Sequence, residues 1–152
     1  MKPVVFLRIA SVLTLIHSIL HTVGGVFSTP DPGISAITWA AMKANQFPVF
    51  GAMRSYFQFY RGLGLGITIF LTAEAIVFWQ LGALAKTDAA RLRPIIATFM
   101  IAYLVFAVNS YEYFFFFPVI TEILIAACLG MAIATAKAVH PERAERLASG
   151  RA

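Results

Sequence analysis

The chain has few charged side chains. Only 12% of its 152 residues are charged, about half the share that soluble domains carry, whereas 60% are hydrophobic. With a mean hydropathy of +0.80, so few charges cannot cover a water-facing surface. The sequence therefore predicts a membrane protein, and its length allows one domain, residues 1–152, with no separate soluble one.

Cysteine is almost absent. The one cysteine, Cys128, lies in the apolar run 125–130. It cannot form an internal disulfide, and the sequence contains no Cys-x-x-Cys pair. We expect it to be a small packing residue, which speaks against thiol–disulfide chemistry.

The basic residues are unevenly distributed along the chain. No basic stripe interleaved with aromatic residues is present, so a nucleic-acid partner is not expected despite the net charge of +5. Most basic residues flank apolar segments on one side: Lys2, Arg8, Lys86, Arg91, Arg93, Lys137, Arg143, Arg146 and Arg151. Only Lys43 and Arg54 fall in the opposite loop. This is the positive-inside pattern that orients membrane helices.

Four apolar segments are long enough to span a bilayer, which takes roughly 20 helical residues. They cover residues 4–26, 57–85, 94–117 and 118–139. The first resembles a signal peptide but lacks a clear small-x-small cleavage site, so we interpret it as an uncleaved helix. The prediction is an all-α, multi-pass protein with four transmembrane helices in an up-down bundle, turning at the Phe117/Pro118 corner.

The charge pattern predicts a topology in the cell inner membrane. Both termini, including the polar tail 140–152, and the loop 86–93 are expected in the cytoplasm. The loop 28–56 is then outside and contains a helical stretch, 34–45, with Trp39 suited to the headgroup layer. Asp31 is expected to cap this helix, with Pro32 at its first position. We expect a short interfacial helix.

Six polar residues are expected at one depth in the outer half of the membrane, because a helix rises about 1.5 Å per residue. They are His17, His21, Arg61, Asn109, Glu112 and Glu122. Ala10, Thr14, His17, His21 and Gly24 follow the 4-3-4-3 spacing of a packed helix seam. Ionisable groups are costly inside a bilayer, so this cluster is the candidate ligand-binding site.

Several functions fit the cluster. His17-x3-His21 has a spacing used for zinc or iron, but the Glu-x-x-His repeats of di-iron bundles are missing, so no metal is assigned. His21 and Glu112 could act as acid and base on a lipid-soluble substrate. Arg61 could hold an anionic or carbonyl group. Without catalysis, the cluster could bind a hydrophobic ligand or a partner helix, or simply join the bundle.

Glu74 lies in the inner half of the second predicted span, where an unpaired carboxyl group is energetically unfavourable. Its estimated depth approaches that of Arg8 on the first span. Glu74 lies on a different face of its helix from Arg61. We therefore expect a structural Arg8–Glu74 ion pair, with a proton relay as the functional alternative.

Three stretches resemble a known family. They contain His21-Thr22-x-Gly24, Phe57-x3-Arg61-Gly62 and the Tyr113–Pro118 corner. Together with the four-span layout they resemble a family of small, four-helix bacterial integral membrane proteins, similar in layout to DoxX-like proteins. His17 is not part of the family pattern. The resemblance implies a bacterial inner-membrane location and this fold, and it supplies no reaction.

The sequence thus predicts an outer-leaflet polar pocket around His21, Arg61 and Glu112. The expected ligand is a small lipophilic molecule or a membrane partner; the alternatives are acid–base catalysis and a purely structural bundle. The expected partners are the lipid bilayer and such a ligand, with a second copy or another membrane protein as further possibilities. No cofactor is identified.

Overall fold

A computed structural model describes residues 2–136 of the chain. They are mostly helical, and four helical segments are long and apolar enough to cross a membrane. These segments are Pro3–Val26, Tyr56–Asp88, Ala90–Tyr113 and Phe116–Thr135. The four predicted spans are therefore confirmed as helices. The end of the fourth predicted span and the predicted cytoplasmic tail 140–152 lie outside the described residues.

The helices differ in detail from the predicted segments. The first span is the α-helix α1 (Pro3–His21) followed by a π-helical turn, η1 (Thr22–Val26), and the second is α3 (Tyr56–Asp88). A 3₁₀ turn, η2 (Ala90–Leu92), leads into α4 (Arg93–Tyr113), and α5 (Phe116–Thr135) follows.

The turn between α4 and α5 lies at Phe114 and Phe115, before the expected Phe117/Pro118 corner. Proline is tolerated in the first turn of a helix because the N–H group that it lacks has no partner there. Pro118 is the third residue of α5 and thus belongs to this first turn.

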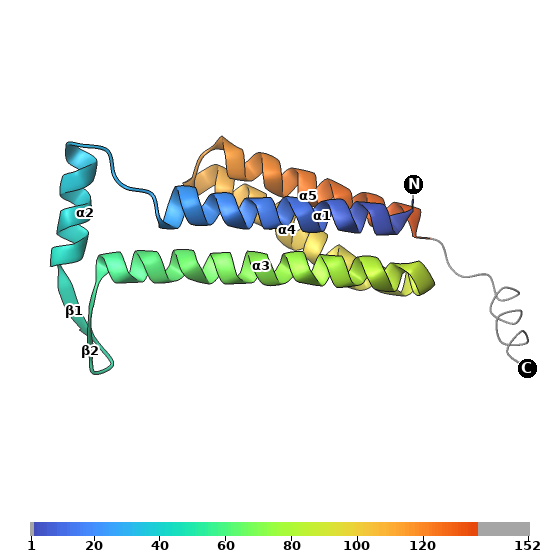
Figure 1. The fold of residues 1–152 in the computed structure, drawn as a ribbon, viewed down its shortest axis with the longest axis horizontal. Helices are drawn as coiled ribbons and strands as arrows, with labels where there is room; N and C mark the ends of the chain where they lie inside the picture. The colour runs from blue at the N-terminus through green and yellow to red at the C-terminus, as the bar shows by residue number, and fades with distance from the viewer. Residues whose placement is uncertain (1, 137–152) are drawn as a thin grey trace, which may run out of the picture. The chain divides into compact units, whose positions relative to one another are not determined.

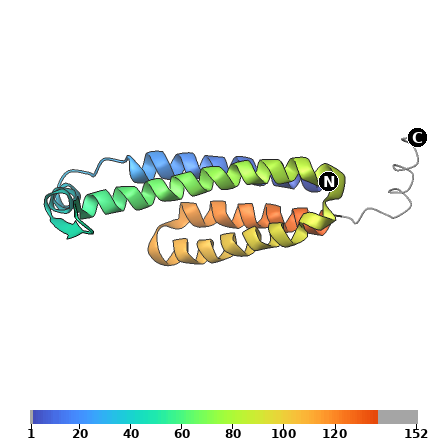
Figure 2. The same cartoon turned by 90° about the horizontal axis from the view of Figure 1, so that it is seen from below.

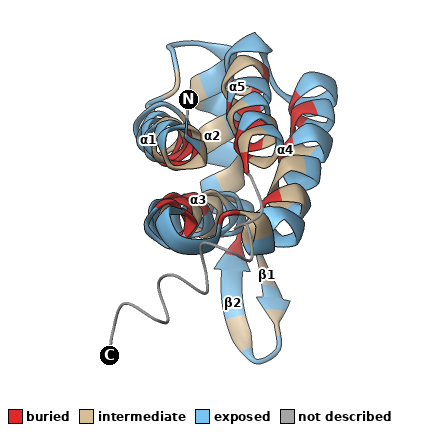
Figure 3. Cartoon of the chain, turned by 90° about the vertical axis from the view of Figure 1, so that its right-hand side faces the viewer, coloured by how far each residue is buried: buried red, intermediate tan, exposed pale blue. Residues whose placement is uncertain are grey.

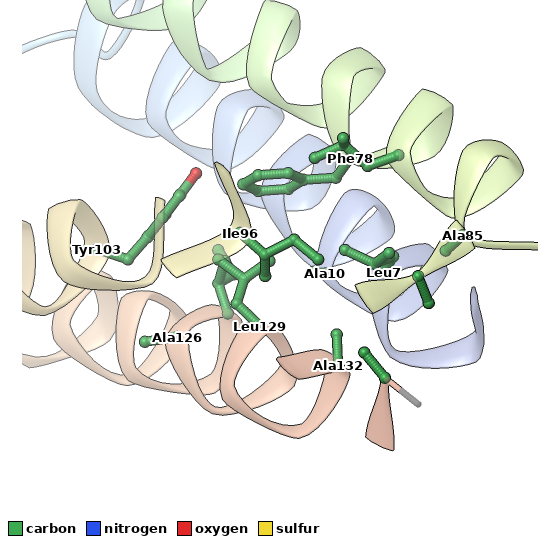
Figure 4. Close-up of a cluster of buried hydrophobic side chains, with 13 residues drawn as sticks. Leu7, Ala10, Phe78, Ala85, Ile96, Tyr103, Ala126, Leu129 and Ala132 are labelled. Carbon is green, nitrogen blue, oxygen red and sulfur yellow. The ribbon is translucent and has the colours of Figure 1, made fainter. Parts of the chain in front are cut away.

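The described residues divide into two structural units. Unit 1 contains residues 2–15 and 74–136, and unit 2 contains Ile16–Ala73. In unit 1, α4 and α5 lie side by side as a helical hairpin (Figure 2). Phe78 of α3 is fully buried there, with its ring edge-on to Phe99 of α4 at 5.1 Å. The core around it is drawn in Figure 4 and includes Leu7, Ala10, Ile96, Tyr103, Ile125, Ala126, Leu129 and Ala132.

Unit 2 contains a β-hairpin that the sequence did not predict. The chain runs through α2 (Ile34–Ala44) into β1 (Gln46–Val49) and β2 (Ala52–Ser55), and β2 leads directly into α3 (Figure 1). The strands are antiparallel and are joined by Phe50 and Gly51, with φ angles of 44° and 83°. Two positive φ angles are typical of a type I′ turn, which usually carries Asn-Gly. Because Phe50 replaces the usual asparagine, the sequence does not indicate this turn.

Helix α2 confirms the expected helical stretch, but its start differs from the prediction. Gly33 is the residue before the first turn, with a φ of 97°, and no side chain caps the helix. The expectation that Asp31 caps it with Pro32 at the first position is therefore wrong. A glycine reaches this positive φ at little cost, and it redirects the chain after Pro32.

Most of the helical surface is exposed and apolar. Figure 3 shows the buried positions of the helices as narrow stripes, with intermediate and exposed positions over the rest. The exposed residues include Leu20, Val23, Ile69, Phe70, Val105 and Val108. Exposed apolar area on this scale is characteristic of a surface that faces lipid rather than water.

Candidate functional site

Hydroxyl groups join α1 and α3 within unit 2. The hydroxyls of Ser18 and Thr72 share a hydrogen bond of 2.9 Å, and those of Thr22 and Thr68 share one of 2.8 Å. Ser18 also donates to the carbonyl of Thr68 at 3.1 Å. Small polar residues four apart on each helix therefore pair across the interface, as in other membrane helix pairs. The four-residue spacing of Thr68 and Thr72 could have indicated this interface, but neither residue was chosen from the sequence.

His21 closes this polar interface at the end of α1. Its Nε2 lies 3.0 Å from the carbonyl oxygen of Gly64 on α3. A carbonyl can only accept a hydrogen bond, so Nε2 carries the proton that it donates, and in the neutral imidazole Nδ1 is left as an acceptor. A Cβ atom on Gly25 would lie 3.7 Å from this Nδ1. Glycine at position 25 therefore leaves room beside the basic nitrogen of His21.

Gly64 permits the close approach of η1 to α3. A Cβ atom at this position would lie 2.8 Å from Cγ2 of Val26, which is too short for a relaxed contact. By contrast, a Cβ on Gly62 or Gly66 would meet nothing within 4 Å. In the run 62–66, the glycine at the helix contact is therefore the middle one, not the Gly62/Gly66 pair that the small-xxx-small pattern suggests.

The π-helical turn η1 lies between His21 and the segment that leads to α2. Phe27 N–H donates to the carbonyl of Thr22 at 3.0 Å, which closes the wider π-type ring. The carbonyl of Gly25 accepts hydrogen bonds from the Ser28 and Tyr60 hydroxyls at 3.2 and 3.4 Å. Single π-helical turns inside α-helices often occur at functional sites. The residues next to η1 are therefore candidates for a functional site.

Arg61 lies against two aromatic rings. Its guanidinium carbon is 4.9 Å from the ring centre of Phe27 and 5.6 Å from that of Phe57. The side chain is half-buried, and its Nε is buried without a hydrogen-bond partner among residues 2–136. No ion pair with Arg61 is formed in that range either. The cation is therefore held by π-faces and keeps its hydrogen-bonding capacity.

His21 and Arg61 lie on the same side of α3. Arg61 and Gly64 are three residues apart on this helix and so share a face, and His21 contacts Gly64. We call His21, Arg61, Phe27 and Phe57 the His21–Arg61 site.

Helix α2 adds an aromatic wall and a second cation next to this site. Trp39 packs on Phe57 and Tyr60 with ring centres 5.1 and 6.2 Å apart. The Lys43 ammonium lies 4.9 Å from the ring centre of Phe57. Unit 2 contains three Lys or Arg residues and a single acidic residue, Asp31. This half of the chain is therefore short of counter-charges for its cations.

The other predicted site residues belong to unit 1, except His17. Glu122 is fully buried in α5, and the hydroxyl of Ser110 donates to its Oε1 at 2.8 Å. Asn109 and Glu112 lie on the exposed surface of α4. Ser110 is thus the α4 residue that faces the buried carboxyl, and sequence reasoning chose its neighbour. His17 is buried on α1 in unit 2, with 7% of its surface exposed.

Arg8 and Glu74 each have a partner other than the one expected. The Tyr103 hydroxyl donates to Oε2 of Glu74 at 2.7 Å and lies 3.4 Å from the hydroxyl of Thr14. The guanidinium carbon of Arg8 lies 3.4 Å from the ring centre of Trp79. Tyr103 and Trp79 were not among the residues chosen from the sequence.

The structure brings together His21 and Arg61 in one unit and Ser110 with Glu122 in the other. The meeting of all six residues at one depth stays a prediction. In the part of the chain that the structure describes, no group of three or more His, Cys, Asp or Glu side chains could hold a metal ion.

These features define the class of the protein. Its four long, apolar helical segments are those of a helical, multi-pass membrane protein. Comparison with family models, with curated proteins and with solved structures finds no match to this chain. The resemblance to small bacterial four-helix membrane proteins therefore stays a prediction.

Proposed function

We propose that this protein binds a small lipophilic molecule with an anionic or carbonyl head group at the His21–Arg61 site, in the outer leaflet of the bacterial inner membrane. The observation that carries the proposal is the state of Arg61. Its guanidinium lies against Phe27 and Phe57 and has no acidic partner among the described residues.

The charge of the site favours an anionic or carbonyl head group. A charged side chain in a membrane segment is energetically unfavourable unless it is paired. An arginine without a counter-ion from the protein therefore favours the binding of an anionic or polar group from a ligand. Its planar guanidinium matches a carboxylate or phosphate through two parallel hydrogen bonds. The Lys43 ammonium, 4.9 Å from the ring centre of Phe57, adds positive potential to the same region.

The surroundings of the site favour a lipophilic body for the ligand. Phe27 is an exposed apolar residue of the site, and the tilted rings of Trp39 and Phe57 pack against each other with ring centres 5.1 Å apart. A molecule dissolved in the bilayer can lie along such residues while its head group reaches the cation. This arrangement of apolar walls with a few polar groups is typical of ligand sites.

The orientation of the chain is part of the proposal. The basic residues at the ends of α1 and α3 that lie in unit 1 support cytoplasmic termini. Unit 2, with α2 and the β-hairpin, is then on the outer side, where α2 acts as an interfacial helix within an up-down bundle.

The proposal is tested by mass spectrometry of the molecules that the full chain retains in mild detergent. We expect the parent protein to retain a lipophilic anion or carbonyl compound and Arg61→Gln to lose it. Arg54→Gln is the matched control, because Arg54 is also a basic residue of unit 2 but is exposed on β2 and donates to a backbone carbonyl. Equal retention by Arg61→Gln and the parent protein would contradict the proposal.

Acid–base catalysis at the same site is a second candidate. The hydrogen bond to Gly64 presents Nδ1 of His21 as a base, and Gly25 leaves space next to it. Under this alternative His21→Ala keeps the bound molecule but no longer converts it, whereas for a simple binding protein no conversion occurs in any variant. The second catalytic candidate from the sequence, Glu112, is exposed on α4 in unit 1, and its role stays a prediction.

A further inference from the structure

The Arg8 side chain in unit 1 has an unusual environment for a membrane cation. Its guanidinium stacks on the ring of Trp79 at 3.4 Å, and the Trp79 side chain is 53% exposed. None of the Arg8 nitrogens donates a hydrogen bond to residues 2–136, and Nη1 is buried. Glu74, which was expected to pair with it, accepts a hydrogen bond from Tyr103.

The backbone of α3 is shaped to receive this arginine. A Cβ atom on Gly82 would lie 3.2 Å from Nε and 3.4 Å from Cδ of Arg8. Glycine at this position therefore lets the side chain lie flat along α3. Trp79, Gly82 and Lys86 follow an i, i+3, i+7 spacing and share one face of the helix. The exposed Lys86 thus continues the same face one turn beyond the arginine.

Arg93 provides a contrast within the same unit. It donates a hydrogen bond to the carbonyl of Ala136 and so has a partner in the protein. Arg8 combines a fixed, stacked position with unused hydrogen-bond donors. A guanidinium with a fixed position and unused donors can bind a planar or tetrahedral oxyanion, such as a carboxylate or a phosphate.

The position of Arg8 indicates where the anion comes from. Arg8 is the sixth residue of α1, so it lies about 7.5 Å along the helix from its first residue. Tryptophan also prefers this interfacial depth. The neighbouring side chains Val5, Val12 and Ile76 are exposed and apolar. These exposed apolar side chains favour an anion that is attached to a hydrocarbon body.

We infer that Arg8, Trp79 and Lys86 form a binding site for the phosphate of an anionic phospholipid, at the end of the protein where its basic residues gather. The site belongs to unit 1 and does not depend on the function proposed for the His21–Arg61 site. Juxtamembrane basic residues attract anionic lipids. Here Trp79 and Gly82 additionally hold one of these basic residues, Arg8, in a fixed position.

Trp79 itself reports on the site. The chain has two tryptophans, so Trp39→Phe leaves Trp79 as the only one. This full-length protein is reconstituted in phosphatidylcholine vesicles with a minor fraction of brominated lipid, either phosphatidylglycerol or phosphatidylcholine. We expect brominated phosphatidylglycerol to quench Trp79 more strongly than brominated phosphatidylcholine does at the same fraction. Equal quenching by the two lipids would overturn the inference.

Variants of Arg8 and Lys86 test whether these two cations cause the preference for phosphatidylglycerol. Quenching of Trp79 reports only lipid that lies next to this side chain, so Arg8→Gln and Lys86→Gln should each reduce the preference for phosphatidylglycerol by about fivefold, the effect of one adjacent cation. Lys86 is exposed, so its variant tests the site even where Arg8→Gln does not fold. The control is Arg91→Gln, which removes an exposed positive charge near the same end of the chain. The inference is wrong where Arg91→Gln lowers the preference as much as Lys86→Gln does.

A further arm separates a lipid phosphate from a free one. Inorganic phosphate added to the vesicles should leave the quenching by brominated phosphatidylglycerol unchanged. Relief of that quenching by inorganic phosphate would show that the site takes a soluble anion, and would overturn the assignment to a lipid.

Discussion

The hydroxyl of Tyr103 donates a hydrogen bond to Oε2 of Glu74 over 2.7 Å. Tyr103 belongs to α4 and Glu74 to α3, so this bond joins two predicted spans inside unit 1. Figure 4 shows the Tyr103 ring beside the apolar core, with its hydroxyl pointing away from α4. A carboxyl group in a membrane segment needs such a partner, because lipid offers no hydrogen bond in place of water.

Removing the Tyr103 hydroxyl should destabilise the protein. Tyr103→Phe leaves Oε2 of Glu74 without its donor, which we expect to cost about 1–3 kcal/mol. Glu74→Gln keeps an acceptor oxygen for Tyr103 and should cost less. Thermal unfolding in mild detergent measures both. In a double-mutant cycle, the loss in Tyr103→Phe/Glu74→Leu should be smaller than the sum of the single losses, and strict additivity would exclude a direct interaction.

Ser110 should contribute more to stability than its neighbour Asn109. Ser110→Ala removes the hydroxyl that donates to Oε1 of the fully buried Glu122, and we expect a loss of about 1–2 kcal/mol. Asn109 is exposed on α4, so Asn109→Ala should change the stability by about 0.5 kcal/mol or less. Denaturant titration of the two variants in the same detergent compares them. A larger loss for Asn109→Ala would mean that α4 is rotated relative to the structure described here.

Alanine substitution should distinguish the three glycines at the start of α3. Gly64→Ala places a Cβ 2.8 Å from Val26, so either η1 or α3 must shift and the melting temperature should fall. Gly62→Ala and Gly66→Ala are matched controls, because their Cβ atoms meet nothing within 4 Å. Both should be neutral or stabilising, by up to about 1 kcal/mol, since alanine is the better helix former. Val26→Ala should partly restore Gly64→Ala, and the absence of any rescue would contradict the contact.

The turn of the β-hairpin should become more stable with asparagine at position 50. Phe50 has a φ of 44°, which is uncommon for a bulky residue, and its side chain is fully exposed. Phe50→Asn relieves this backbone strain, which costs on the order of 1–3 kcal/mol. Hydrogen exchange of the β1 and β2 amides should slow in this variant. Gly51→Ala should have the opposite effect, and unchanged exchange in both variants would argue against the turn.

The helical fold could be predicted from the sequence because its signal is strong and local. A span needs roughly 20 apolar residues, and a bilayer enforces helices there because each backbone polar group must be satisfied within the segment. The ends of the spans depend on a few residues, such as Pro118, that allow more than one boundary. The β-hairpin was missed because the residue types at its turn, Phe50-Gly51, are not the usual ones.

The candidate site was predicted in part. His21 and Arg61 attract attention in any apolar sequence, because polar groups are expensive in a membrane. Their contacts, with Gly64 for His21 and with Phe27 and Phe57 for Arg61, involve residues that carry no comparable signal. Apolar and glycine residues are too common in such a chain to be singled out.

Composition and hydrophobic length are sufficient to predict helices that are long and apolar enough to cross a membrane, and to indicate that certain side chains require partners. The identity of each partner depends on the rotation of the helices. Successive residues on a helix point about 100° apart, so Ser110 faces a buried carboxyl while Asn109 is exposed. For the same reason Glu74 meets Tyr103, and Arg8 is left to stack on Trp79. A local sequence pattern limits such rotations only loosely, because packing against all the other helices sets them together.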